Sequence, residues 1–212
     1  MMGIRTISRL FFCAVLVAGS AGAQNLLTNG SFEEPVFGSS VNYPSTIPGW
    51  TTAPETFEVW NQLQGPGADG NQYLELDVNS CTTVSQTFAT STDNFYRVSL
   101  AFAARAGVQD NRIEVLWNGN VIGTASADGS AVSGNVQWTR HAYAVQQGAA
   151  GSSTLSIRNV DACDGLGSLI DDVSVVVAAP PASIPALGPF GIALLAGGCV
   201  LLARMRLRRR RA

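Results

Sequence analysis

Apolar and polar side chains alternate every second residue along much of the chain, which is the pattern of strands with one buried face. The run Tyr96–Arg105 is the clearest instance. One of its faces is expected to be core, and the other is expected to face outward. The expected core face has Tyr96, Val98, Leu100, Phe102 and Ala104, and the outward face has Arg97, Ser99, Ala101, Ala103 and Arg105.

Glycine, proline, asparagine and aspartate separate these runs, and the central part of the sequence shows no long segment with the 3.6-residue period of an amphipathic helix. The pair Asn118-Gly119 marks a hairpin turn. The pattern predicts an all-β fold, an antiparallel β-sandwich of about ten strands. The predicted strands include Phe57–Trp60, Tyr73–Asp77, Cys81–Phe88, Tyr96–Arg105, Arg112–Trp117, Val121–Ala125, Val136–Val145, Ser153–Val160 and Leu169–Val177.

Two segments of different composition flank the predicted sandwich, residues 24–178. Residues 1–23 have a basic start, an apolar run and a small-residue cleavage site, which predict a secretory signal peptide. At the other end, residues 179–186 form a linker, 187–203 a predicted transmembrane helix and 204–212 an arginine-rich tail. By the positive-inside rule the tail stays in the cytoplasm, so the sandwich is expected on the periplasmic side of the membrane.

Charge and cysteine usage agree with export. All 15 acidic residues lie in the domain with five of the 13 arginines, a net charge of −10. Such a domain would repel nucleic acid, and it is compatible with neutral sugars or divalent cations. Cys81 and Cys163, the two cysteines of the domain, predict one disulfide in an oxidising compartment. The alternative is two separate thiols, and zinc is disfavoured because no second Cys or His lies close by.

Six short motifs follow one another along the predicted sandwich. They are NLLTNGSFEEP at residues 25–35, IPGW at 47–50, FEVW at 57–60, GNQYLELD at 70–77, VSQTF at 84–88 and LIDDVSV at 169–175. Together these motifs resemble the domain-of-unknown-function 642 family and, more broadly, the galactose-binding-like jelly rolls that include many carbohydrate-binding modules. The resemblance implies a jelly-roll β-sandwich whose first and last strands lie side by side, and a binding role without catalysis.

The C-terminal segment contains Ile184-Pro185-Ala186-Leu187 and Phe190-Gly191, followed by an apolar stretch and a cluster of arginines. In these features it resembles a sorting signal of the IPTL-CTERM type, a relative of PEP-CTERM. It implies that the tail is held in the inner membrane and cut by a sorting protease, which releases the domain or transfers it to the cell surface. A permanent anchor would have the same hydropathy, so both interpretations stay open.

Calcium is the cofactor that the sequence suggests. It prefers six to eight oxygen ligands. If the two ends of the domain meet, Glu33 and Asp171 could converge, with carbonyl groups of residues 29–31 completing the shell; related jelly rolls often carry a structural calcium of this kind. Asp171 is favoured over Asp172, because neighbouring residues of a strand point to opposite faces. The alternative is that these acids cap turns or face solvent.

The remaining candidates concern a sugar ligand. Aromatic rings in or beside the long loops Phe37–Gly49 and Gln62–Asn71 could stack on it, whereas Trp117 and Trp138 are expected in the core. The stacking candidates are Tyr43, Trp50, Trp60 and Tyr73.

These features predict an exported, surface-directed module that binds glycan or exopolysaccharide without catalysis. One alternative is a structural or adhesive envelope protein with protein partners. The other is a cell-wall glycan hydrolase, which would need two carboxylates at a set separation; Glu58, Glu75 and Asp77 are its candidates. His141, the single histidine, has no evident catalytic partner in the sequence.

Overall fold

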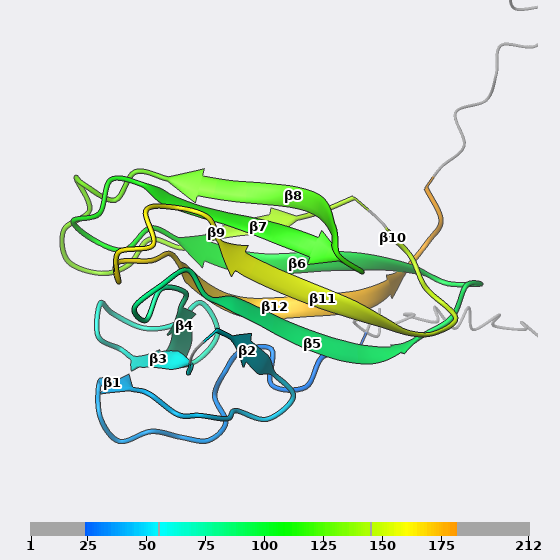
Figure 1. The fold of residues 1–212 in the computed structure, drawn as a ribbon, viewed down its shortest axis with the longest axis horizontal. Coiled ribbons are helices and arrows are strands. Elements are labelled where there is room, and N and C mark those ends of the chain that lie inside the picture. The colour runs from blue at the N-terminus through cyan, green and yellow to red at the C-terminus, as the bar shows by residue number, and fades with distance from the viewer. Residues whose placement is uncertain (1–23, 55, 145, 182–212) are drawn as a thin grey trace, which may run out of the picture.

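The computed structural model describes residues 24–54, 56–144 and 146–181 and shows two antiparallel sheets that form a jelly-roll sandwich (Figure 1). The larger sheet has the order β1-β3-β4-β12-β6-β10, with β9 also paired to β6, and the smaller has the order β2-β5-β11-β7-β8. The all-β prediction is confirmed. The strands are β1 Val41–Asn42, β2 Thr51–Ala53, β3 Glu58–Asn61, β4 Gln72–Glu75, β5 Thr83–Thr90, β6 Phe95–Ala103, β7 Asn111–Trp117, β8 Asn120–Ala127, β9 Thr139–Ala142, β10 Gln146–Gln147, β11 Gly151–Asn159 and β12 Leu169–Ala178.

The predicted signal peptide, transmembrane helix and cytoplasmic tail lie outside the described residues. Within the described ranges, no helix is long and apolar enough to cross a membrane.

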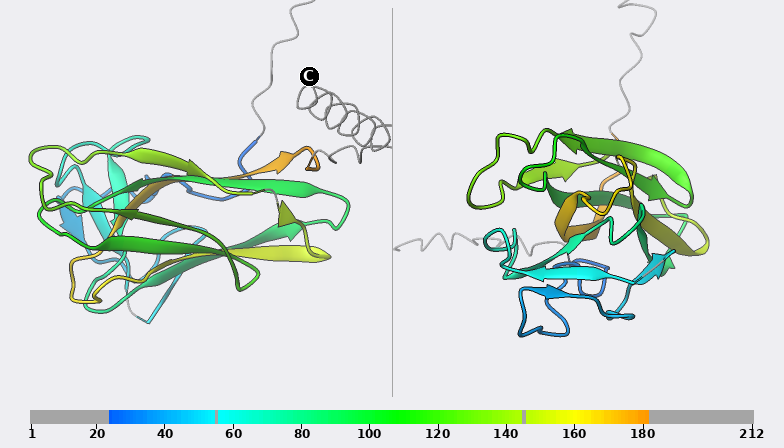
Figure 2. Two further views of the ribbon diagram at one scale, coloured as in Figure 1. Left: turned by 90° about the horizontal axis from the view of Figure 1, so that it is seen from above. Right: turned by 60° about the vertical axis from the view of Figure 1, so that its left-hand side comes forward.

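The main core lies between the two sheets, as the alternation of β6 predicts. Val98 and Leu100 of β6, Val115 of β7 and Ile157 of β11 are at most 1% exposed and belong to one apolar cluster. Each such side chain contributes about 1.5–3 kcal/mol by leaving water. Connections between strands gather at one end of the sandwich, where β1 and β3 also lie (Figure 2).

The outward face predicted for β6 is wrong in its second half. Ala101 and Ala103 are 0% and 1% exposed, because a second apolar cluster covers this side of the larger sheet. Two loops provide the cover, residues 62–71 and 128–138, and a hydrogen bond from Val136 N to a carbonyl oxygen of the first loop joins them over 2.6 Å. Strand alternation identifies the residues of a face, but it cannot show that a distant loop folds over that face.

The two ends of the domain meet, as predicted. Val173 N donates to Gly30 O over 2.9 Å, and Leu26 N donates to Val175 O over 2.8 Å, although the opening segment forms no regular strand. A Cβ atom at Gly30 would overlap Val173 O, so glycine is required where the opening segment approaches β12.

Candidate ligand-binding surface

The outer face of the larger sheet carries a row of polar side chains across β1, β3 and β4. Glu58 of β3 pairs directly with Glu75 of β4. Asn42 of β1 pairs with Val59, so Tyr43, the next residue after β1, adjoins Glu58. The sequence places Glu58 and Glu75 seventeen positions apart, and only the strand register reveals them as neighbours.

Both carboxylates are buried, and protein donors hold them in place. Glu58 is 6% exposed and its Oε1 accepts the indole N–H of Trp60 over 2.6 Å. Glu75 is 1% exposed; its Oε2 accepts Asp77 N over 2.7 Å, and its Oε1 accepts Gly167 N and Arg105 Nη1. These contacts fix the position of Arg105 through a carboxylate that solvent does not reach.

Burial also shifts the protonation of this pair. Loss of hydration raises the pKa of Glu75 to about 7; the Asp77 N–H opposes this rise and the Glu58 charge adds to it. Burial likewise raises the pKa of Glu58, while the Trp60 N–H and Arg105 lower it. Near neutral pH the pair therefore carries less than its full two negative charges.

Glu58→Gln is expected to raise the free energy of unfolding by about 1 kcal/mol at pH 8, because like charges directly opposite on neighbouring strands repel. A carboxyl group whose pKa is raised in the folded state stabilises fully below its unfolded pKa, and this contribution is lost as the pH rises through the folded value. For Glu75 that window runs from the ordinary pKa of a glutamate, 4.5, to about 7. Urea denaturation at several pH values gives the free energy of unfolding. Across this window it should fall less steeply with rising pH in Glu58→Gln than in the wild-type protein.

Glu114→Gln is the control for this pH series, since Glu114 lies in a partly exposed ion pair with Arg158 and does not contact the carboxylate pair. In Glu114→Gln the free energy of unfolding should change with pH as steeply as it does in the wild-type protein. An unchanged slope in Glu58→Gln would contradict the coupling between Glu58 and Glu75.

One edge of the polar row reaches the surface. Tyr43 is 59% exposed, the side chain of Arg105 is 21% exposed and Leu166 is 41% exposed. Besides burial, the charges of Glu58 and Glu75 raise the pKa of Tyr43 and Arg105 lowers it, so the Tyr43 hydroxyl lies within their electrostatic reach. We call Tyr43, Leu166 and the partly exposed Arg105 the Tyr43 surface.

Three groups of the protein hold the Arg105 guanidinium in place. Its Nη1 donates to Gly165 O over 3.1 Å, next to Leu166, and its Cζ lies 5.0 Å from the centre of the Trp60 ring. The guanidinium is therefore fixed by a carboxylate, a carbonyl group and an aromatic face, with other N–H groups left for a ligand.

The four predicted stacking rings have different positions. Trp60 and Tyr73 are 1% and 0% exposed and pack edge-on at 5.9 Å, and Trp50 is 5% exposed against Phe32. These three rings are part of the packed interior, and Tyr43 is the one with an exposed side chain. The expected core position of Trp117 is observed, whereas Trp138 is partly exposed and donates its indole N–H to Pro66 O.

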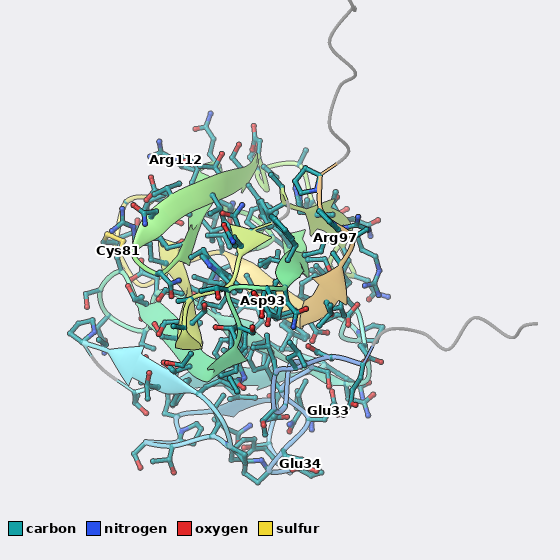
Figure 3. The ribbon with its side chains drawn as sticks, turned by 90° about the vertical axis from the view of Figure 1, so that its right-hand side faces the viewer. Glu33, Glu34, Cys81, Asp93, Arg97 and Arg112 are labelled. Atoms are coloured by element: carbon teal, nitrogen blue, oxygen red, sulfur yellow. A yellow bond between two sulfur atoms is a disulfide. The ribbon has the colours of Figure 1, made fainter. Side chains whose placement is uncertain are left out.

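Glu33 and Asp171, the two predicted metal ligands, hold a loop in place. Glu33 Oε1, in the opening segment (Figure 3), accepts Asn71 N and Gln72 N over 2.7 and 2.6 Å. Asp171 is fully buried, and its Oδ2 accepts Asp69 N over 2.9 Å. Both carboxylates thus secure residues 62–71 over the sheet.

Three of the four carboxylate oxygens of Glu33 and Asp171 accept N–H groups of the protein. Burial raises the pKa of Asp171 to about 8, and the Glu33 charge adds to this rise. In the part of the chain that the structure describes, no group of three or more His, Cys, Asp and Glu side chains gathers to hold a metal ion. Asp172 pairs instead with Arg140.

Comparisons with known proteins identify the family. A family model described as "Protein of unknown function (DUF642)" matches residues 25–176. A multifunctional-autoprocessing repeats-in-toxin protein of Vibrio cholerae serotype O1 is 31% identical over 163 residues, which cover 73% of this chain. The protein of the same name from Vibrio vulnificus is 31% identical over 160 residues, or 71% of this chain. The chain spans 3% of the length of these two relatives.

Two solved structures share the fold. A Stig cyclase from Fischerella sp. TAU has a TM-score of 0.52 and 14% identity, covering 74% of this chain and 98% of the cyclase. An arabinose-bound α-L-arabinofuranosidase has a TM-score of 0.53 and 15% identity, covering 75% of this chain and 27% of that enzyme. At these identities the likeness shows a common sandwich architecture alone.

Proposed function

The chain belongs to the DUF642 family of proteins of unknown function, and we propose that its β-sandwich is an exported, non-catalytic module that binds glycan or exopolysaccharide through the Tyr43 surface. The observation that supports this role is an exposed tyrosine ring within electrostatic reach of Arg105, an arginine held in place by Glu75 and by the face of Trp60. A sugar has apolar ring faces and a belt of hydroxyl groups. A flat aromatic side chain suits the first, and a planar guanidinium with several donors suits the second.

The buried carboxylates fit positioning better than hydrolysis. A glycosidase needs one carboxylate that reaches the bond to be cleaved and a second on the other side of it. Here Glu58 and Glu75 lie directly opposite each other within one sheet, and protein donors bond to both oxygens of Glu75. In this proposal Glu75 orients Arg105, and the ligand contacts Arg105.

Export to the cell surface is part of the same proposal. Its support is the predicted signal peptide at residues 1–23, the predicted membrane segment at 187–203 and the Cys81–Cys163 disulfide of the folded domain. Disulfides persist in oxidising compartments, which include the bacterial periplasm and the cell surface. The inner membrane and a sorting protease would then be the partners of the tail.

Tyr43→Ala is expected to weaken glycan binding at least about fivefold, because a stacked aromatic ring contributes on the order of 1 kcal/mol or more. A glycan array identifies the ligand, and calorimetric titration then gives the dissociation constants. Tyr43→Phe should retain most of the affinity, since it keeps the ring.

Val121→Ala is the matched control, because Val121 is 49% exposed on β8 of the other sheet. Binding that survives Tyr43→Ala unchanged would contradict a site at the Tyr43 surface. A wild-type protein that binds no glycan on the array would favour the alternative, an adhesive envelope protein with protein partners.

A further inference from the structure

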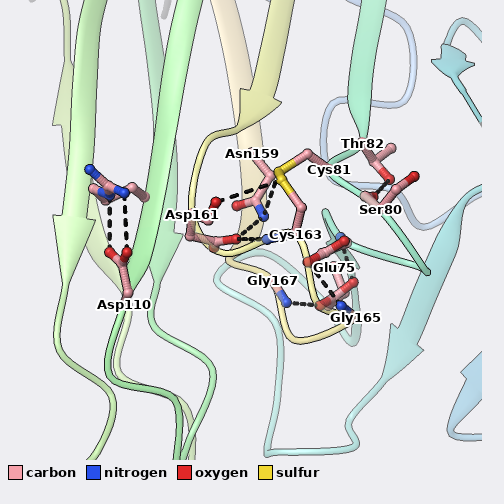
Figure 4. The surroundings of a disulfide bond; sticks show 12 residues. Glu75, Ser80, Cys81, Thr82, Asp110, Asn159, Asp161, Cys163, Gly165 and Gly167 are labelled. Atoms are coloured by element: carbon pink, nitrogen blue, oxygen red, sulfur yellow. Dashed lines mark hydrogen bonds and ion pairs between the residues drawn. A yellow bond between two sulfur atoms is a disulfide. The ribbon is translucent and has the colours of Figure 1, made fainter.

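Buried oxygen atoms without a hydrogen-bond partner gather at one corner of the sandwich, beside the disulfide. Figure 4 labels three of the residues that carry them, Ser80, Asn159 and Asp161. Within the described ranges, seven buried side-chain atoms lack a partner, and all seven are oxygens. Five of them belong to two short segments, residues 77–81 and 159–168, which the Cys81–Cys163 disulfide joins. The five are Asp77 Oδ1, Ser80 Oγ, Asn159 Oδ1, Asp161 Oδ2 and Ser168 Oγ.

Direct contacts show that the two segments face each other. Gly165 N donates to Asp77 Oδ2 over 3.0 Å, and Leu76 N donates to Ser168 O over 3.1 Å. The side chain of Asn159 donates to Asp161 Oδ1. Burial raises the pKa of Asp161, and the charge of Asp77 adds to the rise, so these two carboxylates lie within electrostatic reach of each other.

The corner is rich in acceptors and poor in positive charge. Asp77 is 0% exposed and Asn159 is 3% exposed, yet each keeps one oxygen without a donor. A buried polar atom without a partner is costly, and such atoms often mark a bound water or ion. The nearby arginines are engaged elsewhere, since Arg105 pairs with Glu75 and Arg112 pairs with Asp110.

We propose that this corner binds a divalent cation, with calcium as the matching ion, between Asp77 and Asp161. Asn159 Oδ1 supplies a third oxygen ligand, and hydroxyl groups, carbonyl groups or water complete the shell. Hard cations of this kind take carboxylate, amide and hydroxyl oxygens. The site uses two carboxylates, and it is separate from the Glu33–Asp171 pair, whose oxygens accept N–H groups of the loop.

A cation bound at this site would also affect the Tyr43 surface. Gly165 and Gly167 lie in the segment that the cation would fix, and both contact the Arg105–Glu75 pair. A cation at Asp77 and Asp161 would therefore order the connection that carries Leu166. Cation binding is independent of what the Tyr43 surface recognises, so failure to find a glycan leaves this inference intact.

Two substitutions test the site on the full, disulfide-bonded chain. Asp77→Asn and Asp161→Asn keep the oxygens that accept Gly165 N and Asn159 Nδ2 and replace the unpartnered oxygens with amide groups. Calorimetric titration with calcium chloride should show one site in the wild-type protein and at least about tenfold weaker binding in each variant. In EDTA the variants should unfold at the same temperature as the wild type or above it, because a like charge has been removed.

Asp110→Asn and Glu33→Gln are the controls. Asp110 is an exposed acid near the corner, and Glu33 belongs to the separate Glu33–Asp171 pair. Both variants should therefore bind calcium as the wild type does. Anomalous scattering from a calcium-soaked crystal should place the ion between Asp77 and Asp161. Loss of binding in Glu33→Gln with retention in Asp77→Asn and Asp161→Asn would overturn the proposal, as would a wild-type protein that binds neither calcium nor magnesium.

Discussion

Replacing Cys81 and Cys163 with serine is expected to lower the free energy of unfolding by about 4 kcal/mol. The disulfide joins residues 82 positions apart, so its loss frees a large part of the unfolded chain and increases the entropy of that state. The bond also connects the segment before β5 to the segment before β12. Strand β5 belongs to the smaller sheet and β12 to the larger one. Urea denaturation of the double variant Cys81→Ser/Cys163→Ser measures the difference.

Two controls isolate the effect of the crosslink. Cys13→Ser/Cys199→Ser removes the two other cysteines of the sequence and should leave the stability of the domain unchanged. All measurements are made in EDTA, so that cation binding at Asp77 and Asp161 does not contribute. A loss below about 1 kcal/mol would show that the folded state, through strain or through other contacts, offsets the entropic gain.

Local patterns in the sequence predicted the features that depend on neighbouring residues. The Asn118-Gly119 hairpin is present with φ values of 50° and 81°, which asparagine and glycine tolerate better than other residues. The inward set of β6 is buried between the sheets. Both results follow from period-two alternation and turn chemistry, which need no knowledge of the rest of the chain.

The candidate site was harder to predict because it depends on contacts between distant segments. Trp60 and Tyr73 lie beside long loops in the sequence, which suggested exposed rings. In the structure, the loop of residues 62–71 returns over them, held by Glu33 and Asp171. The alternation of side chains places Arg105 on an outward face, and it gives no sign of the contact with Glu75, thirty positions away.

Trp60→Ala is expected to lower the free energy of unfolding by about 3–5 kcal/mol, the range for removing a large aromatic side chain from a core. The ring is 1% exposed, packs edge-on against Tyr73 and lies beneath the Arg105 guanidinium. Its removal would leave a cavity and take the indole donor from Glu58 Oε1. Chemical denaturation of the variant, measured beside the wild type, gives the loss.

Tyr43→Ala and Trp60→Phe distinguish a core ring from a ligand-binding ring at this place in the fold. Tyr43→Ala removes an exposed ring and should change stability by less than about 0.5 kcal/mol while it weakens glycan binding. Trp60→Phe keeps much of the packing and loses the N–H donor to Glu58, so its stability should lie between those of the wild type and Trp60→Ala. A Trp60→Ala protein of wild-type stability that no longer binds glycan would contradict this assignment, because it would show that the Trp60 ring contacts the sugar.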